Sequence, residues 1–161
     1  MGTWPADVER VAAFLRAAGA DGRIEEVAAE AATAAAAADA IGSTLGQIVK
    51  SLALLADEAP LVALVPGDRR IDTGKVAALV GARRVRIADA ETVVELTGFA
   101  PGGVAPFPLP QIPVILLERR LLRHVTVWAG AGSATHLVRL DPLELVRLTQ
   151  ARVEDIVLES A

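Results

Sequence analysis

The sequence has 161 residues and contains neither cysteine nor tyrosine. The lack of cysteine excludes disulfide bonds, Cys-ligated zinc and thiol catalysis. No apolar stretch approaches the roughly 20 residues that a membrane-spanning helix needs, and no basic segment followed by an apolar one marks a signal peptide. A chain of this length is typical of one domain with a sizeable core. We therefore predict a single domain over residues 1–161 and a cytoplasmic location.

Lysine is also scarce: it occurs only at Lys50 and Lys75, against fourteen arginines, and the net charge is −4. This acidic balance argues against a protein that coats nucleic acid electrostatically. Two basic clusters remain, and each is either a solvated face or a small patch that touches a phosphate backbone: Arg83, Arg84 and Arg86, and Arg119, Arg120 and Arg123. The sequence leaves both interpretations open.

Apolar periodicity and helix-capping residues indicate an α+β fold. Asp72 and Asp89 are predicted to cap two helices that end before Gly81 and Gly98. The predicted helices cover residues 4–15, 31–38, 72–80 and 89–97, and a last one begins at 141. The predicted strands cover 24–27, 47–55, 61–65, 84–87, 114–118, 125–129 and 137–140. We expect one mixed β-sheet flanked by these helices.

Several familiar motifs fail on inspection. Gly74-Lys75 lacks the other residues of a phosphate-binding loop, and Gly130-Ala131-Gly132 leads into a strand where a dinucleotide site requires a helix. His124 and His136 have no partner at metal-ligand spacing. No histidine stands beside a plausible nucleophile, which argues against Ser–His catalysis. We predict no cofactor and no metal.

Three features remain that can carry chemistry: a lysine in an apolar strand, a long Gly/Pro loop and the glycine-serine turn Gly132-Ser133. Lys50 interrupts the apolar run GQIVKSLALL, where it either extends its ammonium to water past apolar neighbours or places a cation in a pocket. Gly102-Gly103 lies in the loop FAPGGVAPFPLPQIP, which is either a flexible turn or a rigid loop whose N–H groups face a ligand. Such main-chain donors can stabilise an oxyanion without a catalytic side chain.

The order of QIVKSL, TGFAPGGVAP and WAGAGS along the chain is similar to the YbaK/EbsC/ProX family of aminoacyl-tRNA deacylases. That family includes the editing domain inserted into bacterial prolyl-tRNA synthetases. The resemblance spans residues 31–156. It implies an α+β fold with a mixed sheet, and hydrolysis of the ester that joins a wrong amino acid to tRNA.

The resemblance also implies site residues. Lys50 matches the functional lysine, and Gly102 leads the GXXXP loop that ends at Pro106. Gly132-Ser133 matches a glycine-rich turn on the same pocket. The catalytic residues implied are Lys50 and Gly102, and the substrate-binding residues are Gly103, Val104, Pro106, Gly132 and Ser133. The implied partners are the acceptor end of aminoacyl-tRNA and a prolyl-tRNA synthetase, for a monomer or homodimer.

Phe107 stands where many members of the family carry a smaller residue. An aromatic ring there would narrow the pocket and favour a small acyl group such as alanyl or seryl, unless Phe107 packs into the core. A small amino acid on tRNA-Pro is the expected substrate. The alternatives are a non-catalytic module of the same fold that binds tRNA or a synthetase, and a structural dimerisation domain.

Overall fold

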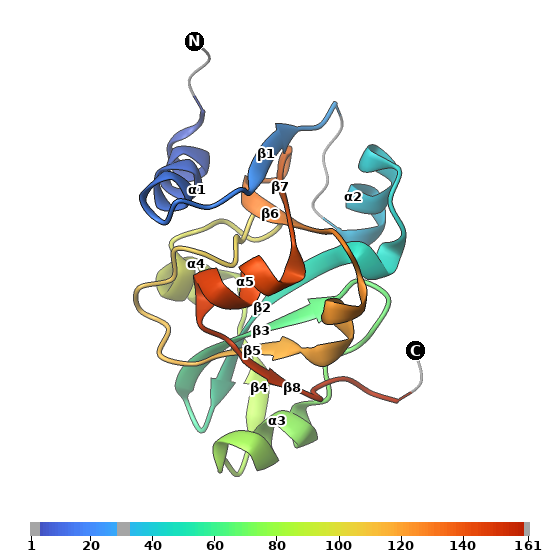
Figure 1. The fold of residues 1–161 in the computed structure, drawn as a ribbon. Coiled ribbons are helices and arrows are strands. Elements are labelled where there is room, and N and C mark those ends of the chain that lie inside the picture. The colour runs from blue at the N-terminus through green and yellow to red at the C-terminus, as the bar shows by residue number, and fades with distance from the viewer. Residues whose placement is uncertain (1–3, 29–32, 160–161) are drawn as a thin grey trace.

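The computed structural model describes residues 4–28 and 33–159, which form one mixed sheet of eight strands with helices around it (Figure 1). The strands are β1 (Arg23–Glu26), β2 (Ile48–Ala56), β3 (Ala59–Pro66), β4 (Val85–Ile87), β5 (Ile115–Glu118), β6 (Val127–Ser133), β7 (His136–Leu140) and β8 (Arg152–Glu154). The helices are α1 (Ala6–Ala17), α2 (Ala34–Ile41), α3 (Thr73–Val80), α4 (Ala90–Thr97) and α5 (Pro142–Thr149), with 3-10 turns η1 (Leu45–Gln47) and η2 (Arg119–Arg123). This arrangement confirms the predicted fold class.

The longest strand, β2, lies at the centre of the sheet. The strand order is β1-β7-β6-β2-β3-β5-β8, and β4 pairs with β2 outside that path. β3 pairs with β2 from Val49 to Ala56, so β6 and β4 share the opposite edge. On that edge the β6 register covers Ile48 and Val49, and the β4 register begins at Leu54. Between these two registers, β2 has no strand partner on this edge within the described residues, which leaves an opening beside Lys50 and Ser51.

Local capping signals account for most helix boundaries. The Asp72 carboxylate accepts hydrogen bonds from the N–H groups of Gly74 and Lys75, and Asp89 accepts one from Thr92. Of the predicted alanine helix, residues 31 and 32 lie outside the described residues. The part that is described begins after Thr33, whose hydroxyl accepts from the N–H of Ala36. The capping predicted for Asp72 and Asp89 is therefore confirmed, whereas the cap at Thr33 was not predicted.

Apolar side chains fill both faces of the sheet. One cluster contains Val49, Leu64, Phe99 and Phe107, together with α1 residues such as Val11. A second cluster lies on the other face, under α3, and includes Leu54, Val65, Val76, Leu116 and Ile156. Successive side chains of a strand point to opposite faces, so β2 and β3 contribute to both clusters. The double-sided burial explains why these two strands read as continuous apolar runs.

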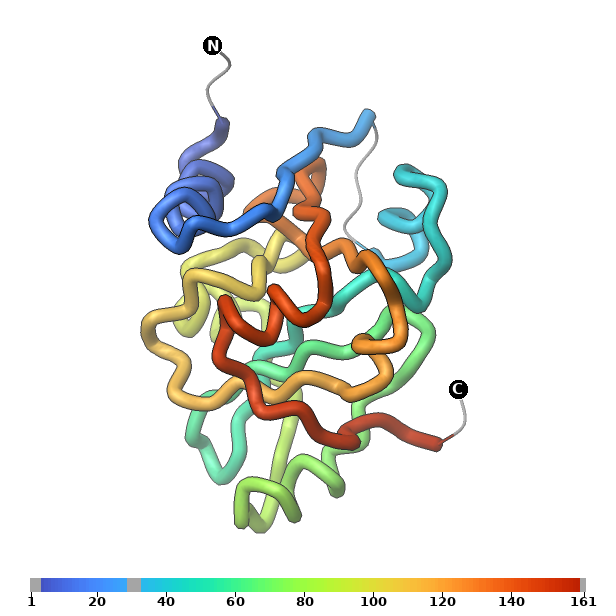
Figure 2. Tube along the Cα trace, viewed as in Figure 1, coloured from blue at the N-terminus to red at the C-terminus, as the bar shows by residue number. Residues whose placement is uncertain are grey.

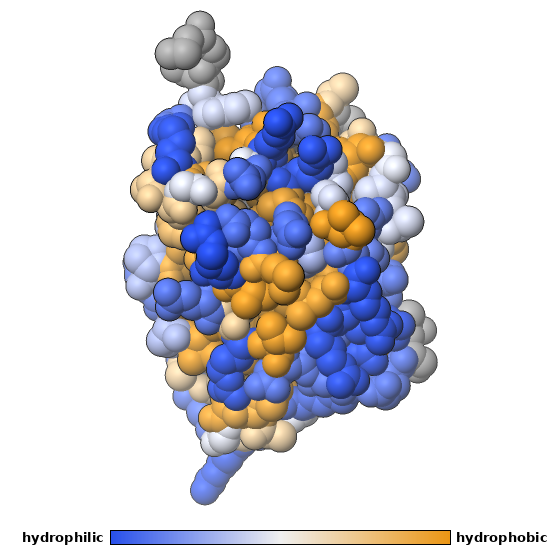
Figure 3. Space-filling model, viewed as in Figure 1, coloured by the Kyte–Doolittle hydropathy of each residue, from blue (hydrophilic) through white to orange (hydrophobic). Residues whose placement is uncertain are grey.

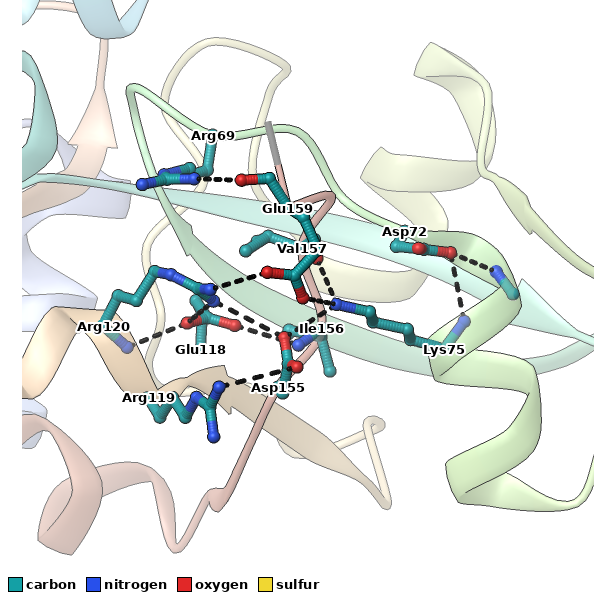
Figure 4. A network of polar contacts seen from close by, with 11 residues as sticks. Arg69, Asp72, Lys75, Glu118, Arg119, Arg120, Asp155, Ile156, Val157 and Glu159 are labelled. Carbon is teal, nitrogen blue, oxygen red and sulfur yellow. Dashed lines mark hydrogen bonds and ion pairs between the residues drawn. The ribbon is translucent and has the colours of Figure 1, made fainter. Parts of the chain in front are cut away.

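The segment that follows α5 was missed by the sequence analysis and is fixed by a polar network (Figure 4). β8 adds to the sheet beside β5, in parallel. The Lys75 ammonium donates to the carboxylates of Asp155 and Glu159 and to the Val157 carbonyl. Hydrogen bonding to Lys75 lowers the pKa of both carboxyl groups. This network ties the C-terminal segment to α3.

Three of the six arginines in the two basic clusters pair with carboxylates. Arg119 and Arg120 both pair with Asp155, and Arg86 pairs with Glu58. For these three arginines, the contacts favour the interpretation of paired surface groups over a patch that is free to bind phosphates.

One face of the molecule exposes a band of apolar residues (Figure 3). In the view of Figure 3, apolar residues cross the middle of the face on which α5 lies, with hydrophilic residues on both sides. Leu143 of α5 is 67% exposed. No helix in residues 4–28 or 33–159 is both long and apolar enough to cross a bilayer.

Candidate active site

A pocket of about 340 Å³ opens at the unpaired interval of the β2 edge. The start of β2, the helix α2 and the loop between α4 and β5 surround it; α2 lies beside the start of β2 in Figures 1 and 2. The lining residues are Thr33, Ala34, Ala37, Ile48, Val49, Lys50, Ser51, Leu52, Gly102, Val104, Gly130 and Leu137. The fold therefore brings Lys50 to the same cavity as Gly102 and Val104, which are distant from it in the sequence.

Lys50 is half-buried in the wall of this pocket. Its ammonium donates a hydrogen bond of 2.8 Å to the carbonyl oxygen of Arg69, in the loop that follows β3. Burial lowers the pKa of Lys50, the nearby charge of Arg70 lowers it further, and Asp68 acts in the opposite direction. The cation is thus tethered to the main chain at the pocket, and it is easier to deprotonate than an exposed lysine.

The loop that carries Gly102 and Gly103 is anchored against β6. The N–H of Gly103 donates to the Ala100 carbonyl and the Gly103 carbonyl accepts from Gly132, each at 3.0 Å. A Cβ at Gly103 would lie 2.9 Å from the Cα of Ser133, so only glycine allows this approach. The interpretation of a flexible turn does not fit this geometry, because the loop is held by main-chain contacts on a strand.

Four of the predicted substrate-binding residues belong to the loop between α4 and β5 or to the strand β6. Gly103, Pro106, Gly132 and Ser133 are not among the lining residues. Gly103 and Gly132 hold the loop on β6 through the hydrogen bond between them. Pro106 is buried after the loop. Gly103 and Gly132 thus support the loop, and the substrate-binding role of the four residues stays a prediction.

The Ser133 hydroxyl lies 2.6 Å from Nδ1 of His136, across the β6–β7 turn. The side chain of His136 is buried, and its Nε2 is 3.4 Å from a carboxylate oxygen of Glu26. The sequence-based statement that no histidine stands beside a nucleophile is therefore wrong. The register of the hairpin, which pairs Ser133 with His136, is the signal that would have revealed this contact.

Phe107 does not narrow the pocket. Its ring is 2% exposed and stacks on Phe14 of α1, with ring centroids 5.0 Å apart. The expectation that it shapes the acyl site is corrected, and the alternative, packing into the core, holds. Small side chains from α2, Ala34 and Ala37, line the pocket instead, together with Leu137.

Known proteins similar to this chain include aminoacyl-tRNA editing proteins. A family model for the aminoacyl-tRNA editing domain matches residues 28–148. YwhH of Bacillus subtilis is 33% identical over 131 residues, covering 81% of this chain and 83% of that protein. EbsC of Enterococcus faecalis, named as a candidate Cys-tRNA(Pro)/Cys-tRNA(Cys) deacylase, is 26% identical over 121 residues, covering 74% of this chain and 73% of EbsC.

A larger enzyme and a solved structure extend the comparison. The proline–tRNA ligase of Desulforamulus reducens is 31% identical over 146 residues, which is 86% of this chain but 25% of that enzyme. The crystal structure of a candidate trans-editing enzyme for prolyl-tRNA synthetase has a TM-score of 0.90 and 38% identity, covering 97% of this chain and 99% of that one. The family match spans most of the sequence. The chain therefore belongs to the aminoacyl-tRNA editing domain family.

Proposed function

We propose that this protein hydrolyses the ester of mischarged aminoacyl-tRNA in trans, removing a small amino acid from tRNA-Pro in the cytoplasm. The observation that carries the proposal is that Lys50 and Gly102 line the same pocket. Membership of the editing-domain family supports it, as does the similarity to a candidate trans-editing enzyme. The acceptor end of tRNA is the proposed partner, alone or presented by a prolyl-tRNA synthetase.

The pocket has the chemistry of a hydrolytic sieve for small side chains. A synthetase pocket discriminates one methylene by only about 1–3 kcal/mol, so errors with small amino acids need a second site. Most lining side chains are apolar, including Ala37, Ile48 and Leu137, and no carboxylate is among the lining residues described. An apolar acyl side chain of small size can enter this pocket.

The reaction needs little from the protein beyond positioning and charge stabilisation. The Lys50 ammonium binds the phosphate of the 3′-terminal nucleotide or the ester carbonyl. The N–H of Gly103 is already used by Ala100, so the loop donors left for the developing oxyanion are those of Gly102 and Val104. A water molecule, positioned by the terminal ribose hydroxyl or a main-chain group, attacks the carbonyl carbon. The bond between the acyl carbon and the ribose oxygen then breaks. The ribose oxygen takes a proton that comes from the attacking water, and the free amino acid leaves.

A panel of mischarged tRNA-Pro tests the proposal. We expect alanyl- and seryl-tRNA to be hydrolysed faster than prolyl-tRNA or esters of bulky amino acids, because the pocket is lined by α2 alanines on one side. Cysteinyl-tRNA belongs in the panel because of the name of EbsC. Release of the labelled amino acid is the measurement. Binding of tRNA without release would favour the non-catalytic module, and faster hydrolysis of a bulky ester would contradict the size selection.

The pH dependence of the rate should report on Lys50. Burial and Arg70 lower the pKa of Lys50, so its ammonium loses the proton at lower pH than an exposed lysine does. A rate that requires the protonated form is highest below that pKa and falls as the pH rises through it. We expect this decline in kcat/KM after subtraction of spontaneous ester hydrolysis. With propionyl-tRNA, whose acyl group has no amine that titrates, the limb should be missing in Lys50→Ala. A profile that is the same in both proteins on this substrate would contradict the role of Lys50.

A further inference from the structure

The unpaired interval of β2 presents main-chain groups to the pocket. Ala53 points its carbonyl to the edge shared by β6 and β4, because that oxygen accepts from the N–H of Ala88. Residues two apart in a strand direct their main-chain groups to the same edge. The N–H and C=O of Ser51 therefore face the opening between β6, which ends its pairing at Val49, and β4.

The side chain of Ser51 adds a polar group that has no partner. Its Oγ is buried, makes no hydrogen bond, and is the one side-chain atom of this kind among the residues described. A buried hydroxyl is normally hydrogen-bonded, so an unpartnered one at a pocket calls for an explanation. Ser51 lines the pocket and pairs with Leu64 of β3. Along β2, Val49 and Ser51 point to the face on which the Gly102 loop lies, whereas Lys50 points to the other face.

We propose that Ser51 binds the α-ammonium group of the aminoacyl ester, through Oγ and its main-chain carbonyl. This inference rests on the proposed function and identifies how that site recognises an amino acid. An ammonium ion in an apolar pocket needs acceptors, and carboxylates are missing from the lining residues described. The Thr33 hydroxyl already accepts from Ala36. Lys50 approaches from the opposite face of β2, which keeps the two cations on different sides of the ester.

A pair of substrates that differ only in the amino group tests this assignment. Alanyl-tRNA and propionyl-tRNA carry acyl groups of nearly the same size, and only the first has an α-ammonium. We expect Ser51→Ala to lower kcat/KM for alanyl-tRNA by about 10-fold or more, as for a lost hydrogen bond to a charged group, and to change propionyl-tRNA by less than about 3-fold. Equal losses on both substrates would overturn the proposal.

The melting temperature separates substrate binding from a structural role. Ser51→Ala removes a hydroxyl that has no partner in the free protein, so the melting temperature should stay the same or rise. A clear fall in melting temperature together with equal losses on both substrates would assign Ser51 to the fold instead of the ligand.

Binding measurements keep this inference distinct from the proposed reaction. If the wild-type protein hydrolyses neither ester, the proposed function fails. The Ser51 assignment is then decided with two stable amides, 3′-(alanylamino)-3′-deoxyadenosine and its propionyl counterpart, titrated by calorimetry. The wild-type protein should bind the alanyl amide about 10-fold more tightly, and Ser51→Ala should lose that preference. Equal affinity of the wild-type protein for both amides would overturn the assignment.

Discussion

Replacement of Lys50 by alanine or by arginine is expected to lower kcat/KM for mischarged tRNA by about 10²–10³-fold, the loss seen when one oxyanion donor is removed. Alanine deletes the cation. Arginine keeps the charge, but its planar fork is larger than the compact ammonium that reaches the Arg69 carbonyl at 2.8 Å. Arg70 would also lie close to the added guanidinium, since its charge already acts on Lys50.

Lys75 provides the matched control, because it is the other lysine of the chain and lies in the C-terminal network. Lys75→Ala should leave deacylation unchanged and lower the melting temperature. Both Lys50 variants should change the melting temperature little, since the one hydrogen bond to Arg69 is offset by the cost of burying the ammonium. Near-wild-type turnover in Lys50→Arg would argue against a site specific for an ammonium, and in Lys50→Ala it would end the catalytic assignment.

The elements that the sequence predicts well are those specified by local chemistry. Asp72 and Asp89 cap helices through their own side chains, and the apolar runs of β2 and β3 are long enough to be unambiguous. β8 was missed because the segment Arg152–Glu154 is short and polar and is held by pairing with β5. Strands of this kind depend on distant partners, which a single sequence does not reveal.

The site residues also divide into those that local sequence predicts and those whose position depends on distant pairing. The resemblance pointed to Lys50 and Gly102, and the fold places both on one pocket. It did not indicate the open edge at Ser51, which arises because β6 and β4 pair with different parts of β2. The position of Phe107 was also undetermined, because a ring after a motif proline can face either the pocket or α1. Such questions are decided by register and by which face a loop covers, and neither is a local property.

The second large effect concerns stability and the buried carboxylate at the end of β5. Glu118 is fully buried and accepts from the N–H of Ile156, at 2.9 Å, and from the N–H and guanidinium of Arg120. Glu118→Ala leaves the N–H groups of Ile156 and Arg120 without this acceptor, removes one of the carboxylates that pair with the Arg120 guanidinium, and leaves a cavity. Breaking a buried pair in this way typically costs about 3–5 kcal/mol, and we expect a loss of that size in the free energy of unfolding, measured by chemical denaturation.

Two further variants locate the origin of that loss. Glu118→Gln keeps the shape but turns one acceptor oxygen into a donor that faces N–H groups, so a smaller loss of about 1–3 kcal/mol is expected. Glu58→Ala removes a carboxylate from an exposed pair with Arg86, where the Glu58 side chain is 72% exposed, and should change stability little. If Glu118→Ala is as stable as Glu58→Ala, the buried carboxylate does not hold the C-terminal segment. If the losses in stability follow the predicted order, the carboxylate of Glu118 fixes β8 and the C-terminal segment to the sheet. In the sequence alone, Glu118 is only the last residue of a predicted strand.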